Sequence, residues 1–158
     1  MKIIIGSDHA GFHLKEDLKN YLSGVMSENS EIVDVGTTDD SRCDYPDVAH
    51  ILCQHVIDME NQAGKSDPQE VGFGIIICGS GIGMSMACNR YEKIRCALCC
   101  HDSLARLARQ HNNANVIALG ARFLTVQEAI TLIKTFWRTP FEGGRHQMRV
   151  DKLLCYSR

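Results

Sequence analysis

The sequence lacks a long hydrophobic run and lacks an excess of charge of either sign. Its 17 basic and 19 acidic residues leave a net charge of -2, and it has only three prolines and one tryptophan in 158 residues. Nucleic acids and anionic membrane surfaces are bound by strongly basic surfaces, which this balance excludes. No apolar run reaches the roughly 18–20 residues of a membrane span. We therefore expect no nucleic-acid or membrane partner, and a cytoplasmic protein.

Cysteine, in contrast, is abundant, with eight residues at positions 43, 53, 78, 88, 96, 99, 100 and 155. A chain of this length without a secretory leader does not need a disulfide framework. A zinc site is not indicated either, because no Cys-x-x-Cys pair recurs. We expect most of these cysteines to be small buried hydrophobic residues, and no bound metal.

Short apolar runs alternate with longer amphipathic stretches along the chain. Strands are predicted at 2–6, 31–35, 71–77, 94–98 and 114–119, and helices at 9–26, 46–63, 82–91, 101–110, 125–136 and 143–155. This alternation predicts an α/β fold, a three-layer sandwich around a five-stranded parallel sheet. We expect one domain over 1–158, the flavodoxin-like order 2-1-3-4-5, and a surface loop at 61–70.

Reactive groups follow two strands that this order makes neighbours. Strand 1 ends in Gly6-Ser7-Asp8-His9, and strand 3 ends in Cys78-Gly79-Ser80-Gly81-Ile82-Gly83. Ligands of open α/β sheets bind beyond the carboxyl ends of the strands, where the winding reverses. The sequence therefore places a site between the ends of strands 1 and 3.

The glycine-rich segment at 78–83 has the clearest chemical pattern. Alternating glycines before a helix allow several backbone N–H groups to point into one concavity, which suits a phosphate or a developing oxyanion. The same positive field favours the thiolate form of Cys78, making it a candidate base. The alternative is a tight strand–helix turn whose cysteine only packs, because such glycine loops are individually weak evidence.

Two further groups of residues are ambiguous on their own. His111 ends a predicted helix and would lie at the amino edge of its sheet, so it would serve a neighbouring subunit if it is catalytic. Arg145 and Arg149 are four residues apart and can converge on one anion, and phosphate fits the fork geometry of two guanidinium groups. The alternatives are a helix C-terminal cation for the histidine and a solvated basic stripe for the arginines.

Taken together, these segments resemble the type B ribose-5-phosphate isomerases from residue 1 to about residue 153. The resemblance lies in the following stretches: Gly6-Ser7-Asp8-His9, Asp44-Tyr45-Pro46, Cys78-Gly79-Ser80-Gly81-Ile82-Gly83, Arg109-Gln110-His111-Asn112, Gly120-Ala121-Arg122 and Gly143-Gly144-Arg145-His146-Gln147-Met148-Arg149. It implies an aldose–ketose isomerase of the non-oxidative pentose phosphate pathway that interconverts ribose 5-phosphate and ribulose 5-phosphate through a cis-enediolate. It implies no cofactor, and a homodimer or dimer of dimers with shared active sites, the C-terminal helix lying at the interface.

The resemblance also implies a role for each site residue. Cys78 would move the proton between carbons 1 and 2, and His111, with Asn112 beside it, would open the sugar ring. Asp8 would contact the sugar hydroxyls. The enediolate would be stabilised by Gly79, Ser80, Gly81, Ile82 and Gly83, and the phosphate would be bound by His9, Arg122, Arg145 and Arg149. Asp44 and Tyr45 are weaker candidates for lining the pocket. Met84 stands where some relatives have a glutamate base, so the thiol version applies here.

Three alternatives remain open from the sequence. An isomerase of a six-carbon sugar phosphate, such as allose 6-phosphate or galactose 6-phosphate, would share these motifs, because the distance from Cys78 to the arginines sets the sugar length. A flavodoxin-like binding module would need a phosphate cradle after strand 1, which Gly6-Ser7-Asp8-His9 does not provide. A redox sensor would use Cys99 and Cys100, although adjacent cysteines strain a disulfide ring.

Overall fold

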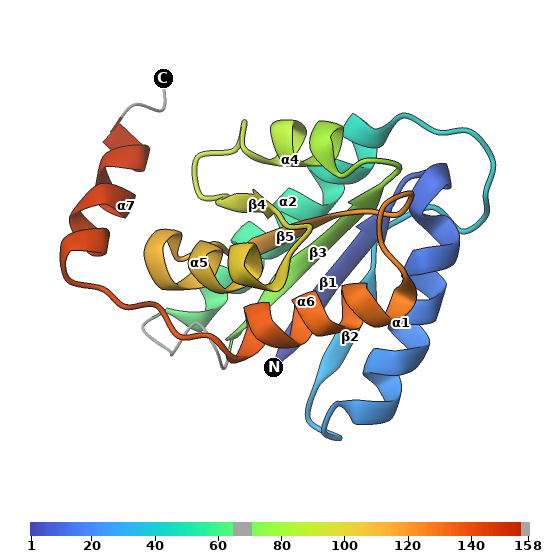
Figure 1. The fold of residues 1–158 in the computed structure, drawn as a ribbon. Coiled ribbons are helices and arrows are strands. Elements are labelled where there is room, and N and C mark those ends of the chain that lie inside the picture. The colour runs from blue at the N-terminus through green and yellow to red at the C-terminus, as the bar shows by residue number, and fades with distance from the viewer. Residues whose placement is uncertain (65–70, 156–158) are drawn as a thin grey trace.

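The computed structural model describes residues 1–64 and 71–155, and it shows one parallel sheet with helices on both faces (Figure 1). The strands are β1 (Lys2–Ser7), β2 (Glu31–Asp34), β3 (Gly72–Cys78), β4 (Cys96–Leu98) and β5 (Val116–Gly120). The helices are a 3-10 turn η1 (His9–Gly11), α1 (Phe12–Val25), α2 (Tyr45–Ala63), α4 (Ile82–Cys88), α5 (Asp102–Asn112), α6 (Val126–Arg138) and α7 (Arg145–Cys155). The predicted α/β sandwich is confirmed. Within the described ranges, no helix combines the length and the apolar character that a bilayer crossing needs. Of the loop predicted at 61–70, residues 65–70 lie outside the described residues.

Two hydrophobic cores form because successive strand residues face opposite sides of the sheet. Ile3 and Ile5 of β1 pack with α1, α5 and α6, whereas Ile4 between them packs with α2 and α4. All three side chains are fully buried, which explains why β1 is a continuous apolar run and not an alternating one. The site therefore rests on a sheet that is covered on both faces.

The predicted strand order is wrong at one edge, because the observed order is β2-β1-β3-β5-β4. The physical reason lies in the handedness of the crossovers. Right-handed connections that move in opposite directions along a sheet place their helices on opposite faces. The chain moves outward from β3 to β4 through α4 and back to β5 through α5, and these two helices do pack on opposite faces. The order 3-4-5 would need both on the same face.

Burial explains why β5 takes the inner position. All five residues of β5 are buried, whereas the three residues of β4 are partly exposed or exposed. A short, half-buried strand suits the edge of a sheet, where one side of its backbone has no partner strand. The correction leaves β1 and β3 adjacent, so the predicted switch point stays where the sequence placed it.

The last helix extends away from the body of the molecule. In Figure 1, α7 stands at the side of the fold, and it packs on α5. The helix α5 follows β4 and runs back toward the amino edge of the sheet before β5 begins. Side chains at the end of α5 and on α7 therefore lie far from the carboxyl ends of β1 and β3.

Replacement of Lys15 by methionine is expected to destabilise the fold. Its side chain is 1% exposed, and its ammonium group pairs with Asp34 of β2 and lies 2.7 Å from Glu16 Oε1. Removing one partner of a buried ion pair costs up to about 3–5 kcal/mol, and we expect about 2 kcal/mol because Lys19 still pairs with Asp34. Urea unfolding at fixed protein concentration measures the change. Lys19→Met is the matched control on the same cluster, and an equal loss in both variants would contradict a special role for the buried lysine.

Candidate active site

Cys78 ends β3, the middle strand of the sheet, and its side chain is only 5% exposed. The Gly81 N–H donates a hydrogen bond to its Sγ over 3.1 Å. This contact fixes the position of the sulfur atom at the start of the loop. The thiol and the loop that follows it form one structural unit.

Gly81 has a left-handed backbone with φ of 75° at the N-cap of α4. A Cβ at this position would lie 2.5 Å from Leu98 Cδ1 and 3.0 Å from the Leu119 carbonyl carbon. Both the conformation and the space demand glycine, which keeps the Gly81 amide directed at Cys78. The glycine pattern recognised in the sequence thus has a structural cause.

Substitution of Gly81 by alanine is expected to reduce both stability and turnover. The left-handed conformation costs alanine about 1–2 kcal/mol, and the clash with Leu98 and Leu119 adds to this or displaces the loop. Thermal unfolding and kcat are the measurements. Gly24→Ala is the matched control, because Gly24 lies within α1 with no atom near its Cβ position and alanine should stabilise the helix by about 0.5–1 kcal/mol. Full activity in Gly81→Ala would contradict the positioning of this amide.

Arg122 lies against the same loop. The Ala121 N–H donates to the Cys78 carbonyl over 2.9 Å, and the Arg122 N–H donates to the Gly79 carbonyl over 3.1 Å. A Cβ on Gly79 would lie 3.1 Å from Arg122 Nε, so the absence of a side chain lets the guanidinium group rest on the loop. A fixed positive charge therefore borders the thiol, as an anionic ligand requires.

The other residues of the loop are also held in place. Ile82 N–H donates to Ser80 Oγ over 3.3 Å, and a Cβ on Gly83 would lie 2.9 Å from Cζ of the Tyr45 ring. Tyr45 is the first residue of α2, directly after Asp44. The structure thus brings this weaker candidate to the start of α4, where its ring covers the loop.

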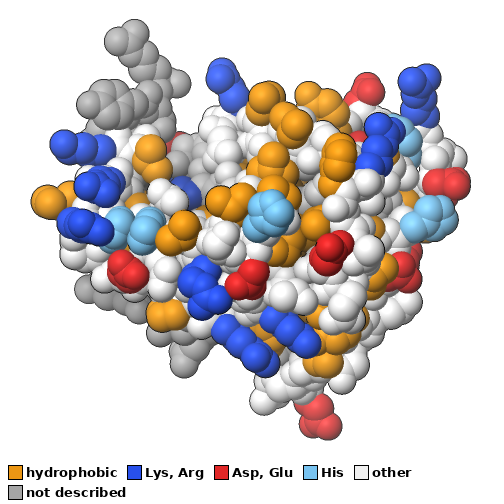
Figure 2. All heavy atoms as spheres, in the orientation of Figure 1, with side chains coloured by type: hydrophobic (Ala, Val, Ile, Leu, Met, Phe, Trp, Pro, Cys, Tyr) orange, Lys and Arg blue, Asp and Glu red, His pale blue; other side chains and the backbone are white. Residues whose placement is uncertain are grey.

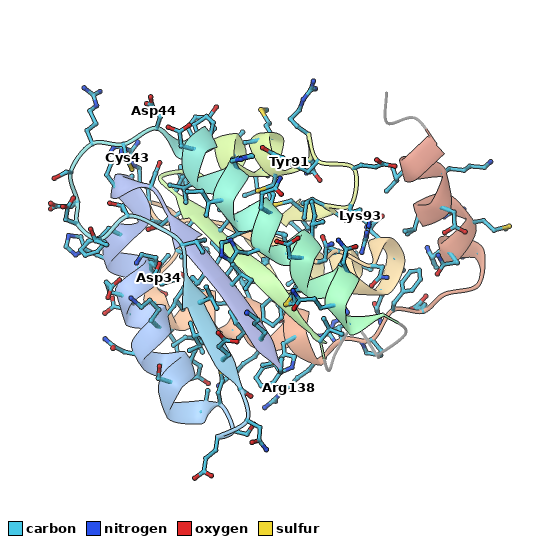
Figure 3. All side chains as sticks on the ribbon, turned by 180° about the vertical axis from the view of Figure 1, so that it is seen from behind. Asp34, Cys43, Asp44, Tyr91, Lys93 and Arg138 are labelled. Atoms are coloured by element: carbon cyan, nitrogen blue, oxygen red, sulfur yellow. The ribbon has the colours of Figure 1, made fainter. Side chains whose placement is uncertain are left out.

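Asp8 and His9 come from the neighbouring strand end, as predicted. The Asp8 N–H donates to the Ile77 carbonyl over 3.2 Å, next to Cys78. Asp8 Oδ1 accepts hydrogen bonds from the Ala10 and Gly11 amides, so this carboxylate caps η1. His9 Nδ1 lies 3.3 Å from the Cys43 carbonyl oxygen and 3.4 Å from the Cys43 backbone nitrogen, so the ring rests on the backbone of Cys43. Figure 3 shows Cys43 and Asp44 on the segment that leads into α2.

The remaining predicted residues gather at the opposite end of the molecule. His111 and Asn112 end α5, and Arg145 and Arg149 lie on α7, which packs against α5. Figure 2 shows Lys, Arg and His side chains together over α7. The described part of one chain thus forms two separate groups, one around Cys78 and one around His111.

His111 has a close partner that sequence reasoning missed. Its ring stacks on that of His146, with centroids 4.2 Å apart and an interplanar angle of 4°. Burial lowers the pKa of His146, and the positive charges of His111 and Arg145 lower it further. A neutral, buried ring therefore fixes the orientation of His111. The only sequence signal was the position of His146 between two arginines of the Gly143–Arg149 motif.

One cluster among the described residues has the composition of a metal site. The donor atoms of His111, Glu142 and His146 lie within 4.8 Å of one another. Two parallel rings do not direct their lone pairs at one point, however, and Arg145 Nε lies 3.4 Å from His146 Nε2. The Arg145 guanidinium group thus occupies the Nε2 side of His146 that a metal ion would need, while Glu142 Oε2 lies 3.6 Å from the same nitrogen.

Comparisons with known proteins agree with the geometry. The profile of the Ribose/Galactose Isomerase family matches residues 3–153. Ribose-5-phosphate isomerase B of Escherichia coli is 38% identical over 154 residues, which are 98% of this chain and 95% of the relative. A ribose 5-phosphate isomerase from Thermotoga maritima has a TM-score of 0.84 at 45% identity, covering 96% of both chains. Ribose-5-phosphate isomerase B from Mycoplasma genitalium, solved with bound ribulose 5-phosphate, has a TM-score of 0.84 at 39% identity, covering 98% of this chain and 95% of that one.

Proposed function

The chain belongs to the ribose/galactose isomerase family, and from this premise we propose that it interconverts ribose 5-phosphate and ribulose 5-phosphate. Full-length relatives are named for this reaction, and one of them was solved with ribulose 5-phosphate. The observation that supports the chemistry most directly is the Gly81 amide on Cys78 Sγ, beside Arg122. This contact holds the sulfur atom of the proposed base at the start of the glycine loop.

The reaction needs one base that works on one face of the sugar. Cys78 removes the proton from carbon 2 of the open-chain aldose and returns it to carbon 1, and the reverse reaction uses the same path. Negative charge develops on the oxygens of the enediolate, where amides of the 79–83 loop, the Ser80 hydroxyl and the positive end of α4 stabilise it. One such preorganised donor typically raises the rate about 10²–10³-fold.

Phosphate binding positions the sugar against the thiol. His9 and Arg122 lie at the Cys78 end, and the oxygen of Asp8 that does not cap η1 can accept from a sugar hydroxyl. Binding energy from a remote phosphate holds the reacting carbons in place, which lowers the barrier for a substrate that carries it. His111 opens the ring, Asn112 supports it, and Arg145 and Arg149 complete the phosphate grip.

These last four residues reach Cys78 only if they come from a second copy, so we infer a homodimer, or a dimer of dimers, with shared sites. A two-fold axis can place α7 of each chain over the carboxyl end of β3 in the other chain. The group around His111 in one chain then meets the group around Cys78 in its partner, and the dimer contains two such shared sites. Apolar surface is available for this contact: Ile82 and Met86 on α4 are 48% and 66% exposed, and Met148 on α7 is 65% exposed. Figure 2 shows hydrophobic side chains on the upper part of the molecule, where α4 lies in Figure 1.

We also propose that the chain works as a single domain in the cytoplasm. All five strands join one sheet, which supports a single domain. Seven free cysteines among the described residues suit a reducing compartment, where thiols persist.

A coupled assay with the purified protein tests the activity and its substrate length. We expect turnover of ribose 5-phosphate to exceed that of allose 6-phosphate and galactose 6-phosphate, tested side by side. The sugar must span from Cys78 to the phosphate-binding arginines, and one extra carbon changes this span. A higher kcat/KM for a six-carbon substrate would favour the alternative within the family, and no turnover of any of the three would contradict the proposal.

A further inference from the structure

The segment that joins α6 to α7 is fixed against the end of α5. The Glu142 N–H donates to the Gln110 carbonyl over 3.1 Å, one residue before His111. Two glycines with left-handed backbones follow, Gly143 with φ of 64° and Gly144 with φ of 53°, a conformation that other residues adopt only with strain. The chain then enters α7, whose second residue is the stacked histidine. This turn therefore brings a carboxylate and a second imidazole to the same ring.

The two rings of this cluster differ in exposure. The His146 ring is parallel to that of His111, and His146 is 4% exposed, whereas the His111 side chain is 37% exposed. Glu142 Oε2 lies 3.6 Å from His146 Nε2 and 3.9 Å from His111 Nε2. Figure 2 shows His, Arg and acidic side chains together at this edge of the molecule. The buried ring is thus a support, and the exposed ring is the one that can reach a ligand.

The end of α5 does not need His111 as a cap. The Asn113 N–H donates to the Arg109 carbonyl over 3.1 Å, and the Ala114 N–H donates to the Ala108 carbonyl over 3.0 Å. Backbone groups therefore already satisfy the last turn, as helix ends require. This leaves the imidazole available for another role and argues against the helix-capping alternative raised by the sequence.

Charge distinguishes the two rings as well. Burial lowers the pKa of His146, the positive charges of His111, Arg145 and Arg149 lower it further, and Glu142 opposes them. Two parallel rings in contact do not both carry a charge readily, because like charges at short distance disfavour the ionised form. A proton held by this pair therefore rests on the exposed ring, with the Glu142 carboxylate beside it as the compensating charge.

We propose that His146 and Glu142 are positioning residues for His111: the buried ring sets the plane of the imidazole, and the carboxylate compensates its charge while the sugar ring opens. This inference rests on the proposed function, in which His111 opens the ring. The step balances without an oxidant. The imidazolium donates a proton to the ring oxygen, which keeps the electron pair of its broken bond to carbon 1. The carbon 1 hydroxyl returns a proton to the imidazole as the aldehyde forms.

Two rates separate a positioning role from a structural one. Conversion of ribose 5-phosphate requires ring opening. Incorporation of solvent deuterium at carbon 1 of ribulose 5-phosphate does not, because the phosphate on oxygen 5 keeps this ketose open. We expect His146→Ala and Glu142→Gln to lower the first rate about 10–100-fold and the second less than about threefold, since a displaced imidazole impairs ring opening alone. Equal losses in both rates would overturn the positioning role.

Matched variants test the two contacts one at a time. His146→Phe keeps a flat ring in the stack and should recover most of the activity that His146→Ala loses. Asp151→Asn exchanges an exposed carboxylate of α7 for an amide, as Glu142→Gln does nearby, and should leave both rates unchanged. Glu142 is 48% exposed, so its variant is the safer one if the His146 variants do not fold, which circular dichroism verifies. A His146→Phe protein that is folded but no more active than His146→Ala would contradict the stacked support.

The ring contact can also be measured without turnover. A ring that faces another at 4.2 Å has its proton resonances shifted by the ring current, so His146→Ala should move the ring resonances of His111 in an NMR spectrum. Asp151→Asn should leave them in place. Unchanged His111 resonances in folded His146→Ala would overturn the inference. Shifted resonances in a protein that is inactive toward every sugar phosphate would contradict the proposed function and leave the ring contact standing.

Discussion

Cys78→Ala is expected to lower kcat for ribose 5-phosphate about 10³-fold while the protein stays folded. General-base catalysis typically raises a rate about 10²–10⁴-fold. Among the described residues, no other thiol or carboxylate accepts a hydrogen bond from the Gly81 amide. The substitution removes one buried sulfur atom, so the cost in stability is small beside the loss in turnover. Initial rates in both directions and a thermal unfolding curve measure the two effects.

Controls for this variant come from the other cysteines of the same chain. Cys100→Ser should retain nearly full activity, because its side chain is exposed and lies outside the loop. Thiol alkylation should inactivate the wild-type protein at a rate that substrate slows. If Cys78→Ala keeps more than a small fraction of wild-type kcat, the base is a different group.

The second large effect that we expect is a recovery of enzymatic activity. When inactive Cys78→Ala and inactive His111→Ala are denatured and refolded together, activity should return. In a dimer with shared sites, a hybrid contains one site with both lesions and one intact site. Each hybrid should therefore have about half of the wild-type activity. Random pairing makes about half of the dimers hybrid, so the mixture should recover about a quarter.

Self-contained sites give the opposite result. Every site in every hybrid then carries one lesion, and the refolded mixture stays inactive. Native mass spectrometry must verify that hybrids form, and each variant refolded alone is the control. An inactive mixture that contains verified hybrids would contradict the shared site, whatever the dimer interface proves to be.

The sequence was most informative where one physical effect dominates. All five strands were predicted within about two residues at their starts. The continuous apolar runs of β1, β3 and β5 left little choice of pattern, because these strands are buried on both faces. The placement of Cys78 followed from the same reasoning, since it ends such a run. The far position of His111 also followed, because α5 returns from the carboxyl to the amino edge of the sheet.

What the sequence could not provide depends on packing between distant segments. The exchange of β4 and β5 depends on which face α5 covers, and its amphipathic pattern does not reveal that choice. The stacking of His146 on His111 joins two helices, and the contact of Cys43 with His9 joins two loops. None of these pairs has a characteristic spacing along the chain, so only the folded structure shows them.

The position of β5 between β3 and β4 also has a consequence for synthesis on the ribosome. The ribosome makes β4 before β5, yet among the described strands β4 pairs with β5 alone, so it has no strand to join when it leaves the exit tunnel. Until residue 120 has emerged, the nascent chain presents both β4 and the open edge of β3 to its surroundings. Unpaired strand edges are sites of intermolecular association. The last third of the chain therefore closes the sheet and ends the period in which the newly made protein is most prone to aggregate.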